Sequence, residues 1–490
     1  MRRPAIAAAA TALALLGPAA PALAHPGIAL DPTLPFDVTY SATDNVEHLG
    51  RFPEHFGTAG GRPSADGTLF YLTDPRGVYV YDTSKPEDPT LVGSLPLYQT
   101  TTGVALAQED PDTDGEILLV DAALSPASAS SQLRVVDVSD PTEPELVGSA
   151  PVTDHTWNCV SDVLDDGTVD TCAYAYGRTG HIVDLRDPTK PAKVADWRKA
   201  IGYTPYTHDL TEIRPGLVMT AGASSVLLDT SDPEFPVQLA EIGDPARFKT
   251  TGLGYHSVEW ARGGHDHFVV LGTEIAPGAV PGAPSNTAGS DCEGSESVIE
   301  TWDARKVKEA LEVYAETGDV AAFDGVEFTK VDSYSASGRG LFVDGKAAAS
   351  QLYCAHWMEP HPDFHNGGLL AVAYYNRGTR FLEVSRDGMM TEIGWMTPAE
   401  GYTGSPQWIS DDVVYAMDYR RGLEVLRLKP AEATKVVERS TDLIAPASTF
   451  ELPPVDPMTR EIVVGGSVLL LLLLAAVERV ARRRAAVRAA

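Results

Sequence analysis

The sequence predicts an all-β fold, a seven-bladed β-propeller spanning residues 25–440. Three observations support this prediction. A β-branched, aromatic-rich strand formula recurs seven times, its best copies end in a turn of the type Asp-x-Ser-Asp-Pro, and the units are about 40–50 residues long, the size of a four-stranded blade. An array of β-sandwiches is the alternative, but it gives no reason for one turn formula at this period.

Each unit predicts a strand, an aspartate-containing turn and a second short strand, with two more strands upstream. The aspartate carboxylates can cap the turn, and proline stops strand pairing. The seven copies of the formula begin at Val78, Leu133, His181, Ser225, Ile299, Arg380 and Gly422.

An N-terminal segment predicts how the ring closes. The stretch from Val46 to Phe52 resembles the strand that follows each turn, such as Leu146-Val147-Gly148. We therefore expect this segment to complete the last blade. Closure of this kind hides the strand edges that an open stack of sheets would expose.

The strand formula followed by Asp-x-Ser-Asp-Pro resembles the LVIVD-repeat family of exported bacterial and archaeal propellers. The resemblance covers most of residues 45–440 and is strongest in the first four copies. It implies the fold and export from the cell, and much less about chemistry.

Both ends of the chain predict an exported protein held in the cell membrane. Residues 1–24 have the charged start, apolar run and small-residue cleavage site of a signal peptide. The apolar stretch 461–478 predicts one transmembrane helix, preceded by a Pro-rich stalk at 441–460. The arginine-rich tail 479–490 should stay cytoplasmic, which places the propeller outside the cell. A buried soluble helix is the alternative for the apolar stretch.

The formal net charge of −30 bears on the class of partner. Such a surface repels phosphate backbones, so we expect no nucleic-acid binding. The expected partner of this monomer is a surface protein, a glycan or a small ligand.

Four cysteines in an exported chain suggest disulfides. Cys159 and Cys172 flank a turn-rich stretch that would join two antiparallel strands, so a bridge across that hairpin is expected. Cys292 and Cys354 would then pair by elimination. Free thiols are the alternative.

Four consecutive units carry a histidine at the head of the innermost strand. Innermost strands line the central channel, so these side chains would form an arc at one mouth: His155, His208, His256 and His356. Neutral imidazole is the commonest transition-metal ligand, and several from different strands could hold copper, zinc or iron. The layout is similar to that of selenium-binding protein and methanethiol oxidase propellers, which implies a channel metal. The structural alternative is that each histidine satisfies backbone groups of the neighbouring blade.

Acidic and aromatic residues just after these histidines could complete a pocket, although strand alternation sends some of them into the sheet interior. They are Trp157, Asp209, Glu259, Trp260, Trp357 and Glu359.

Two weaker patterns also suggest cation sites. Histidine-rich turns in neighbouring units would lie on the face opposite the arc, where they form a surface metal site or bind nothing specific; they contain His265, His267, His361 and His365. An acidic loop has the oxygen spacing of a calcium site, with a solvated turn as its alternative; its ligands would be Asp110, Asp112, Asp114 and Asp121.

The sequence leaves three functions open and does not decide whether the protein is an enzyme. A non-catalytic propeller that binds a partner through its loops is favoured, because the fold supplies a channel whether or not it is used. A metal-dependent oxidoreductase with the histidine arc as its ligands is the second hypothesis. A calcium-stabilised structural or adhesion component is the third.

Overall fold

The computed structural model describes most of the propeller. The described residues are 39–58, 60–97, 109–123, 131–152, 154, 156–164, 166–251, 253–275, 297–336, 342–343, 346–347, 354–399, 401–429 and 436–440. The predicted signal peptide, stalk, transmembrane helix and cytoplasmic tail lie outside these residues. No helix in the described part of the chain is both long and apolar enough to cross a membrane.

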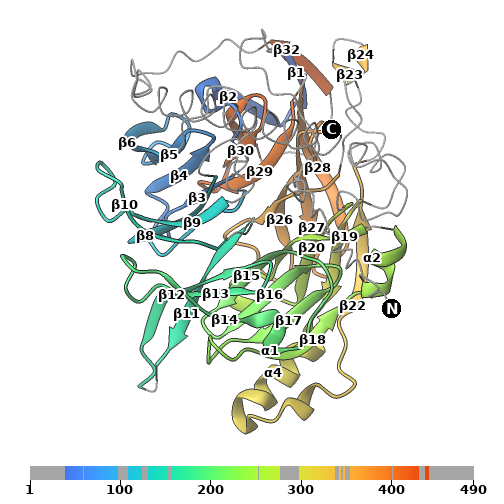
Figure 1. Ribbon diagram of the computed structural model, residues 1–490. Coiled ribbons are helices and arrows are strands. Elements are labelled where there is room, and N and C mark those ends of the chain that lie inside the picture. Colours follow the sequence, from blue (N-terminus) through green and yellow to red (C-terminus); the bar gives the residue numbers. More distant parts are fainter. Residues whose placement is uncertain are drawn as a thin grey trace, which may run out of the picture. The chain divides into compact units, whose positions relative to one another are not determined.

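The described strands form seven blades that follow one another along the chain, each a meander of antiparallel strands (Figure 1). The first three blades are β3 (Gly60–Pro63), β4 (Leu69–Asp74), β5 (Gly77–Asp82) and β6 (Thr90–Pro96); β7 (Asp112–Thr113), β8 (Ile117–Ala123), β9 (Ser131–Asp137) and β10 (Glu145–Ala150); and β11 (Trp157–Val163), β12 (Val169–Gly177), β13 (His181–Asp184) and β14 (Ala192–Asp196).

The next three blades complete most of the ring. They are β15 (Thr207–Arg214), β16 (Leu217–Gly222), β17 (Ser225–Asp229) and β18 (Val237–Ile242); β19 (Leu253–Glu259), β20 (Phe268–Ile275), β21 (Ile299–Asp303) and β22 (Thr329–Tyr334); and β25 (Met358–Pro360), β26 (Gly368–Ala373), β27 (Thr379–Val384) and β28 (Met390–Pro398). The sixth sheet is extended by β1 (Thr39–Thr43) and β32 (Val436–Ser440), an addition that the repeat pattern does not predict.

The seventh blade closes the ring in the predicted way. It contains β29 (Thr403–Trp408), β30 (Val413–Asp418) and β31 (Gly422–Leu428), and its outer strand is β2 (Val46–Phe52) from the N-terminal part of the chain. The strand β2 pairs antiparallel with β31, from Val46 opposite Leu428 to Phe52 opposite Leu423. The predictions of seven blades and of closure by this segment are therefore confirmed.

All seven copies of the strand formula form the third strand of a blade. In the best-preserved copies the turn after this strand is capped as predicted. In β9 the carboxylate of Asp137 accepts a hydrogen bond of 2.9 Å from the backbone N–H of Ser139. In β17 Asp229 does the same for Ser231, at 2.8 Å. The carboxylate caps the turn because it satisfies an N–H that has left the strand ladder.

The core lies between blades and not at a single centre. Each pair of neighbouring blades shares its own hydrophobic cluster, and the cluster between the seventh and first blades joins Phe70 and Leu72 to Tyr415 and Val425. Strand side chains alternate between the two faces of a sheet, so every blade contributes to two such clusters.

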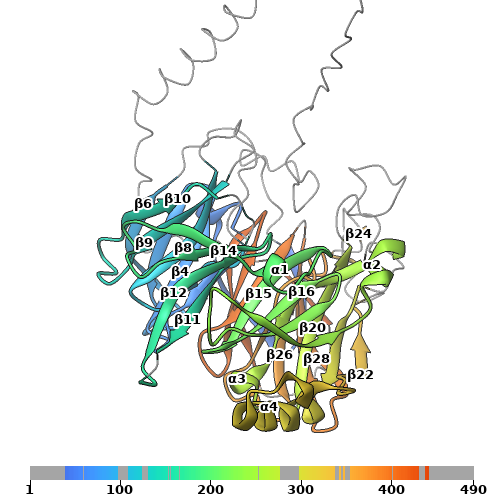
Figure 2. The ribbon, with the colours of Figure 1, turned by 60° about the horizontal axis from the view of Figure 1, so that its bottom comes forward.

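Helical segments are inserted between strands. They are η1 (Pro53–His55), α1 (Trp197–Ala200), α2 (Pro245–Thr251), α3 (Ala261–Gly264), α4 (Arg305–Thr317) and η2 (Val320–Phe323), and β23 (Phe342–Val343) pairs with β24 (Lys346–Ala347) in a separate hairpin. The helix α4 buries Val307, Ala310 and Leu311 against blades four and five. Figure 2 shows α3 and α4 close together at the same edge of the propeller.

Candidate functional site

Three of the four predicted histidines come together at the channel mouth. His208 lies in β15, His256 in β19 and His356 just before β25, and their side chains are almost wholly buried. Their rings follow one another, with centroids 3.8 Å apart for His208 and His256 and 4.0 Å apart for His256 and His356. His155 lies outside the described residues, so its place in the arc stays a prediction.

A carboxylate from another blade meets all three imidazoles. Glu109, just before β7, is 2% exposed, and its Oε2 lies 3.8 Å from the Nε2 atom of each of His208, His256 and His356. Three imidazole nitrogens from three blades therefore surround one oxygen of a carboxylate from a fourth blade.

The hydrogen bonds of Nδ1 indicate the tautomer of two of these imidazoles, those of His208 and His356. His208 Nδ1 lies 3.1 Å from the carbonyl oxygen of His256, and His356 Nδ1 bonds to the carbonyl oxygen of Gly404. A carbonyl oxygen only accepts, so each Nδ1 must donate, and in the neutral ring Nε2 then carries the lone pair. This orientation is typical of metal-ligating histidines. The structural role expected as the alternative, a hydrogen bond to the backbone of the neighbouring blade, is also present for His208 and His356.

A second carboxylate, Glu274, lies at the end of β20. Its Oε2 is 3.4 Å from Nε2 of His256. Among the described residues, two groups place three potential ligand atoms within 4.8 Å of one another, and His256 belongs to both: Glu109, His208 and His256; His256, Glu274 and His356.

The donor set fits a divalent transition metal. Ligand bonds of about 2.0–2.2 Å in a tetrahedral site place neighbouring ligand atoms roughly 3.3–3.6 Å apart, close to the separations of 3.4 and 3.8 Å. No group of ligand atoms within 4.8 Å among the described residues contains both His208 and His356, so these two side chains must move closer together to share an ion. Imidazole nitrogens with carboxylate oxygens suit zinc, iron and copper(II). The carboxylates also balance the charge of a divalent ion in a buried place.

Aromatic side chains enclose the histidines. The ring of Trp357 stands edge-on to His256, with centroids 5.2 Å apart, and the ring of Tyr375 lies 4.6 Å from that of His356. Burial raises the pKa of Tyr375, Tyr402 and Tyr419 well above the usual range, so their hydroxyls remain protonated donors.

A layer of carboxyl groups lies farther along the same innermost strands. Burial raises the pKa of Asp110 and of Glu359 to about 7, and that of Asp209 and Glu259 well above the usual range. Arg62 projects from β3 into this layer. It bonds Asp112 at 3.1 Å, and it lowers the pKa of both Asp110 and Glu359 in opposition to burial.

The sequence identified part of this pocket. Trp357 was expected near the histidines and is there, whereas Asp209, Glu259 and Glu359 belong to the carboxyl layer. Two other tryptophans are core residues: Trp157 and Trp260. Glu109 and Glu274 were not predicted. Hairpin register could have found Glu274, because it pairs with Gly254, two residues from His256. Glu109 had no such signal.

The two histidine-rich turns come together through hydrogen bonds. Asn366 accepts a hydrogen bond of 3.1 Å from the N–H of His267 and bonds Asp266, which joins the two turns. His361 uses both ring nitrogens, since Nδ1 accepts from the N–H of Asp363 at 3.0 Å and Nε2 lies 3.2 Å from the carbonyl oxygen of Asp411. None of the predicted surface ligands in these turns belongs to a group able to share an ion among the described residues.

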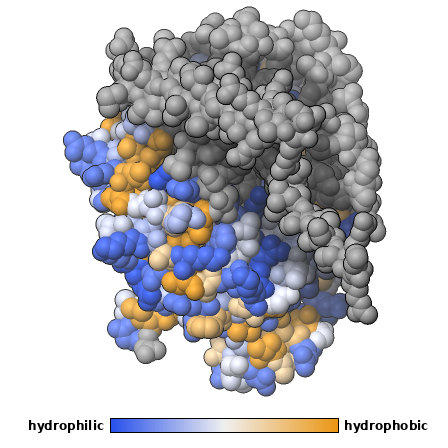
Figure 3. Space-filling view, viewed as in Figure 1, coloured by the Kyte–Doolittle hydropathy of each residue, from blue (hydrophilic) through white to orange (hydrophobic). Residues whose placement is uncertain are grey.

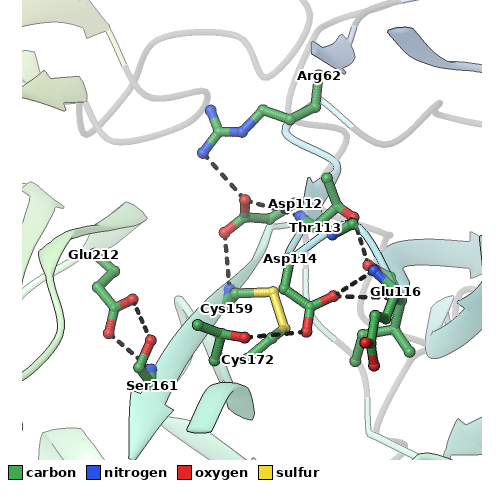
Figure 4. Close-up of a disulfide and its surroundings, with 12 residues drawn as sticks. Arg62, Asp112, Thr113, Asp114, Glu116, Cys159, Ser161, Cys172 and Glu212 are labelled. Carbon is green, nitrogen blue, oxygen red and sulfur yellow. Dashed lines mark hydrogen bonds and ion pairs between the residues drawn. A yellow bond between two sulfur atoms is a disulfide. The ribbon is translucent and has the colours of Figure 1, made fainter. Parts of the chain in front are cut away.

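The acidic loop forms a hairpin whose carboxylates have protein partners of their own. Asp112 accepts from Arg62 and, at 2.9 Å, from the N–H of Cys159 (Figure 4). Asp114 caps its own turn by accepting from the N–H groups of Glu116 and Ile117, both at 2.9 Å. Among the described residues, no group of ligand atoms able to share an ion contains any of the four predicted calcium ligands, so the calcium site stays a prediction: Asp110, Asp112, Asp114 and Asp121.

The hairpin disulfide is present. Cys159 in β11 and Cys172 in β12 are bonded, with Cα atoms 4.4 Å apart, as predicted (Figure 4). Cys354 is also disulfide-bonded. Its expected partner, Cys292, lies outside the described residues, so that pairing stays a prediction.

Comparison with known proteins adds distant likenesses only. No protein-family model and no curated protein matches the chain. The structure of U3-55K is 8% identical with a TM-score of 0.48, covering 78% of this chain and 98% of that one. The RRP9 WD40 repeats are 8% identical with a TM-score of 0.49, covering 78% and 97%. The Myceliophteria thermophila Cps50 (Swd1) β-propeller domain is 9% identical with a TM-score of 0.49, covering 79% and 99%.

Proposed function

We propose that this protein is a metal-binding β-propeller whose channel mouth holds one transition-metal ion. The ligands are Nε2 of His208, His256 and His356 and the carboxylate of Glu109. The observation that supports the proposal most is the equal distance of 3.8 Å from one Glu109 oxygen to all three nitrogens. Copper, zinc and iron are the candidate metals.

The proposed activity is that of a metal-dependent oxidoreductase acting on a small molecule. A bound metal of this kind supplies Lewis acidity or exchange of electrons. The protein contributes the enclosure by Trp357 and Tyr375, which limits access of water to the ligands. Glu359, with a pKa of about 7, is a group able to exchange a proton at neutral pH, as proton-coupled reactions require.

Metal content of the purified propeller tests the proposal. We expect about one equivalent of metal per chain, in line with one four-ligand site. Replacement of His208 and His356 by asparagine should remove most of it. Asparagine retains a donor near the position of Nδ1 and lacks Nε2, so the bonds to the neighbouring blades have a substitute while the ligands do not.

Exposed histidines provide the matched control. The double variant His265→Asn/His365→Asn changes two exposed turn residues and should keep the metal. A folded propeller that stays metal-free after incubation with copper, zinc and iron would disprove the proposal. It would return the protein to the role of a binding scaffold that the sequence favoured.

We also propose that the propeller is displayed on the outside of the cell. The disulfide between Cys159 and Cys172 supports export, because such bonds persist in oxidising compartments. Protease added to intact cells should digest the propeller, and truncation before Ile462 should release a soluble product. Retention of the truncated chain by the cells would contradict the anchor.

A further inference from the structure

Glu274 stands in the same relation to the histidines as the proposed ligand Glu109. Glu109 Oε1 accepts a hydrogen bond of 2.9 Å from the hydroxyl of Tyr419, and its Oε2 faces the imidazoles. Glu274 Oε1 accepts a bond of 2.6 Å from the hydroxyl of Tyr375, and its Oε2 lies 3.4 Å from Nε2 of His256. Each carboxylate is therefore held at one oxygen by a buried tyrosine and directs the other oxygen to the same imidazole.

The backbone of Tyr375 is in a conformation that bulky residues rarely adopt. Its φ is +39°, in the left-handed region. Two backbone hydrogen bonds of 3.1 Å to Thr403, one in each direction, hold it there. Strain of this kind persists where the surrounding structure over-determines it, and it is concentrated at functional sites.

Tyr402 joins the two tyrosines into one unit. Its ring stacks on that of Tyr375, with centroids 4.2 Å apart and planes at 15°, and it meets Tyr419 edge-on at 5.3 Å. A movement of either ring that takes its hydroxyl away from the carboxylate would disturb this packing. The tyrosines therefore fix the direction of both carboxylates.

We propose, on the basis of the metal site above, that Glu274 is a fifth ligand of the same single ion and that Tyr375 is the positioning residue that holds it. The centre then offers three nitrogen and two oxygen donors and no sulfur. Mixed imidazole and carboxylate donors are those of non-haem iron(II) sites, whereas copper(I) is selected by softer ligands. These donors fit iron(II), as well as zinc and copper(II), and disfavour copper(I).

Cobalt(II) serves as the probe, because its visible absorption bands weaken as the coordination number rises from four to five. We expect one cobalt per chain with the weaker, five-coordinate bands. Glu274→Gln should still bind one ion, with stronger four-coordinate bands and a dissociation constant raised about 10- to 100-fold. Tyr375→Phe should change the spectrum and affinity in the same direction, and by less, because Glu274 is retained but not held.

Tyr415→Phe is the matched control. This buried tyrosine in β30 donates to the carbonyl oxygen of Pro86 at 2.8 Å, so its removal costs a comparable hydrogen bond away from the site. It should leave the cobalt spectrum unchanged, and circular dichroism should show all variants folded. An unaltered spectrum in Glu274→Gln, or two cobalt ions in the parent and one in that variant, would overturn the inference. If the parent chain binds no cobalt at all, the proposed function itself fails.

Discussion

The propeller has two histidine-rich regions in the same neighbouring blades, and only one of them forms a candidate metal centre. At the channel mouth, His208, His256 and His356 direct Nε2 to a carboxylate from another blade. In the turns at the other end of the strands, His361 has both ring nitrogens in hydrogen bonds and His265 is exposed. Local density of histidine therefore does not make a metal site.

The difference follows from the symmetry of the fold. Residues at the heads of innermost strands converge on one axis, so a ligand from any blade can meet ligands from the others. Turn residues lie around the rim, where each has only its immediate neighbour. On the face drawn in Figure 3, the hydrophobic residues of the described part of the chain form small separate patches. A site that needs several ligands is thus favoured at the axis.

The largest expected effect comes from the carboxylate that completes the channel site. Glu109→Gln should weaken metal binding by more than about 100-fold, beyond the range typical of residues that only orient ligands, because a neutral amide replaces a charged ligand. Competition with a chromophoric chelator measures the constant. Glu212→Gln in β15 alters another carboxylate of an innermost strand and serves as control. Equal affinities for these two variants would remove Glu109 from the site.

A substitution in the histidine-rich turns should lower the stability of the protein and leave its metal content unchanged. His361→Ala removes the bonds to Asp363 and Asp411 and the edge contact with Trp408 at 4.8 Å. We expect the free energy of unfolding to fall by about 1–3 kcal/mol, since the N–H of Asp363 and the carbonyl oxygen of Asp411 lose a partner that is 7% exposed. Denaturant titration measures it. A loss of metal in this variant would show that the two histidine regions are coupled.

The smallest effect concerns pH and the carboxyl layer of the channel. Burial raises the pKa of Glu359 to about 7 in the folded protein, above the usual range for the unfolded chain. The folded state therefore binds this proton more tightly, and its stabilising contribution is lost as the pH rises from about 4.5 through 7. Unfolding midpoints of the metal-free protein between pH 5 and 8 should fall less in Glu359→Gln than in the parent. The control is Glu383→Gln, which changes an exposed carboxylate in β27 and should keep the parent slope.

The repeat pattern determined most of the fold because it reflects local chemistry. The alternating strand residues, the aspartate cap and the proline recur in each unit, and each acts within a few residues of its own position. The seven third strands, the closure by Val46–Phe52 and the bridge between Cys159 and Cys172 could therefore be predicted. The pairing of β1 with β28 and β32 could not, because it joins segments from both ends of the propeller without a repeat signal.

The same division holds for the candidate site. The sequence by itself placed His208, His256 and His356 in register, because equivalent positions of a repeat occupy equivalent places around the axis. It did not indicate Glu109, which meets the histidines from the second blade while they belong to the fourth to sixth blades. Nor did it indicate the strained Tyr375 that holds Glu274. Those contacts join residues about 100 or more positions apart, so they form only when the blades pack against one another. Tyr375 meets Glu274 from the neighbouring blade, whereas Glu109 meets Tyr419 once the ring is closed.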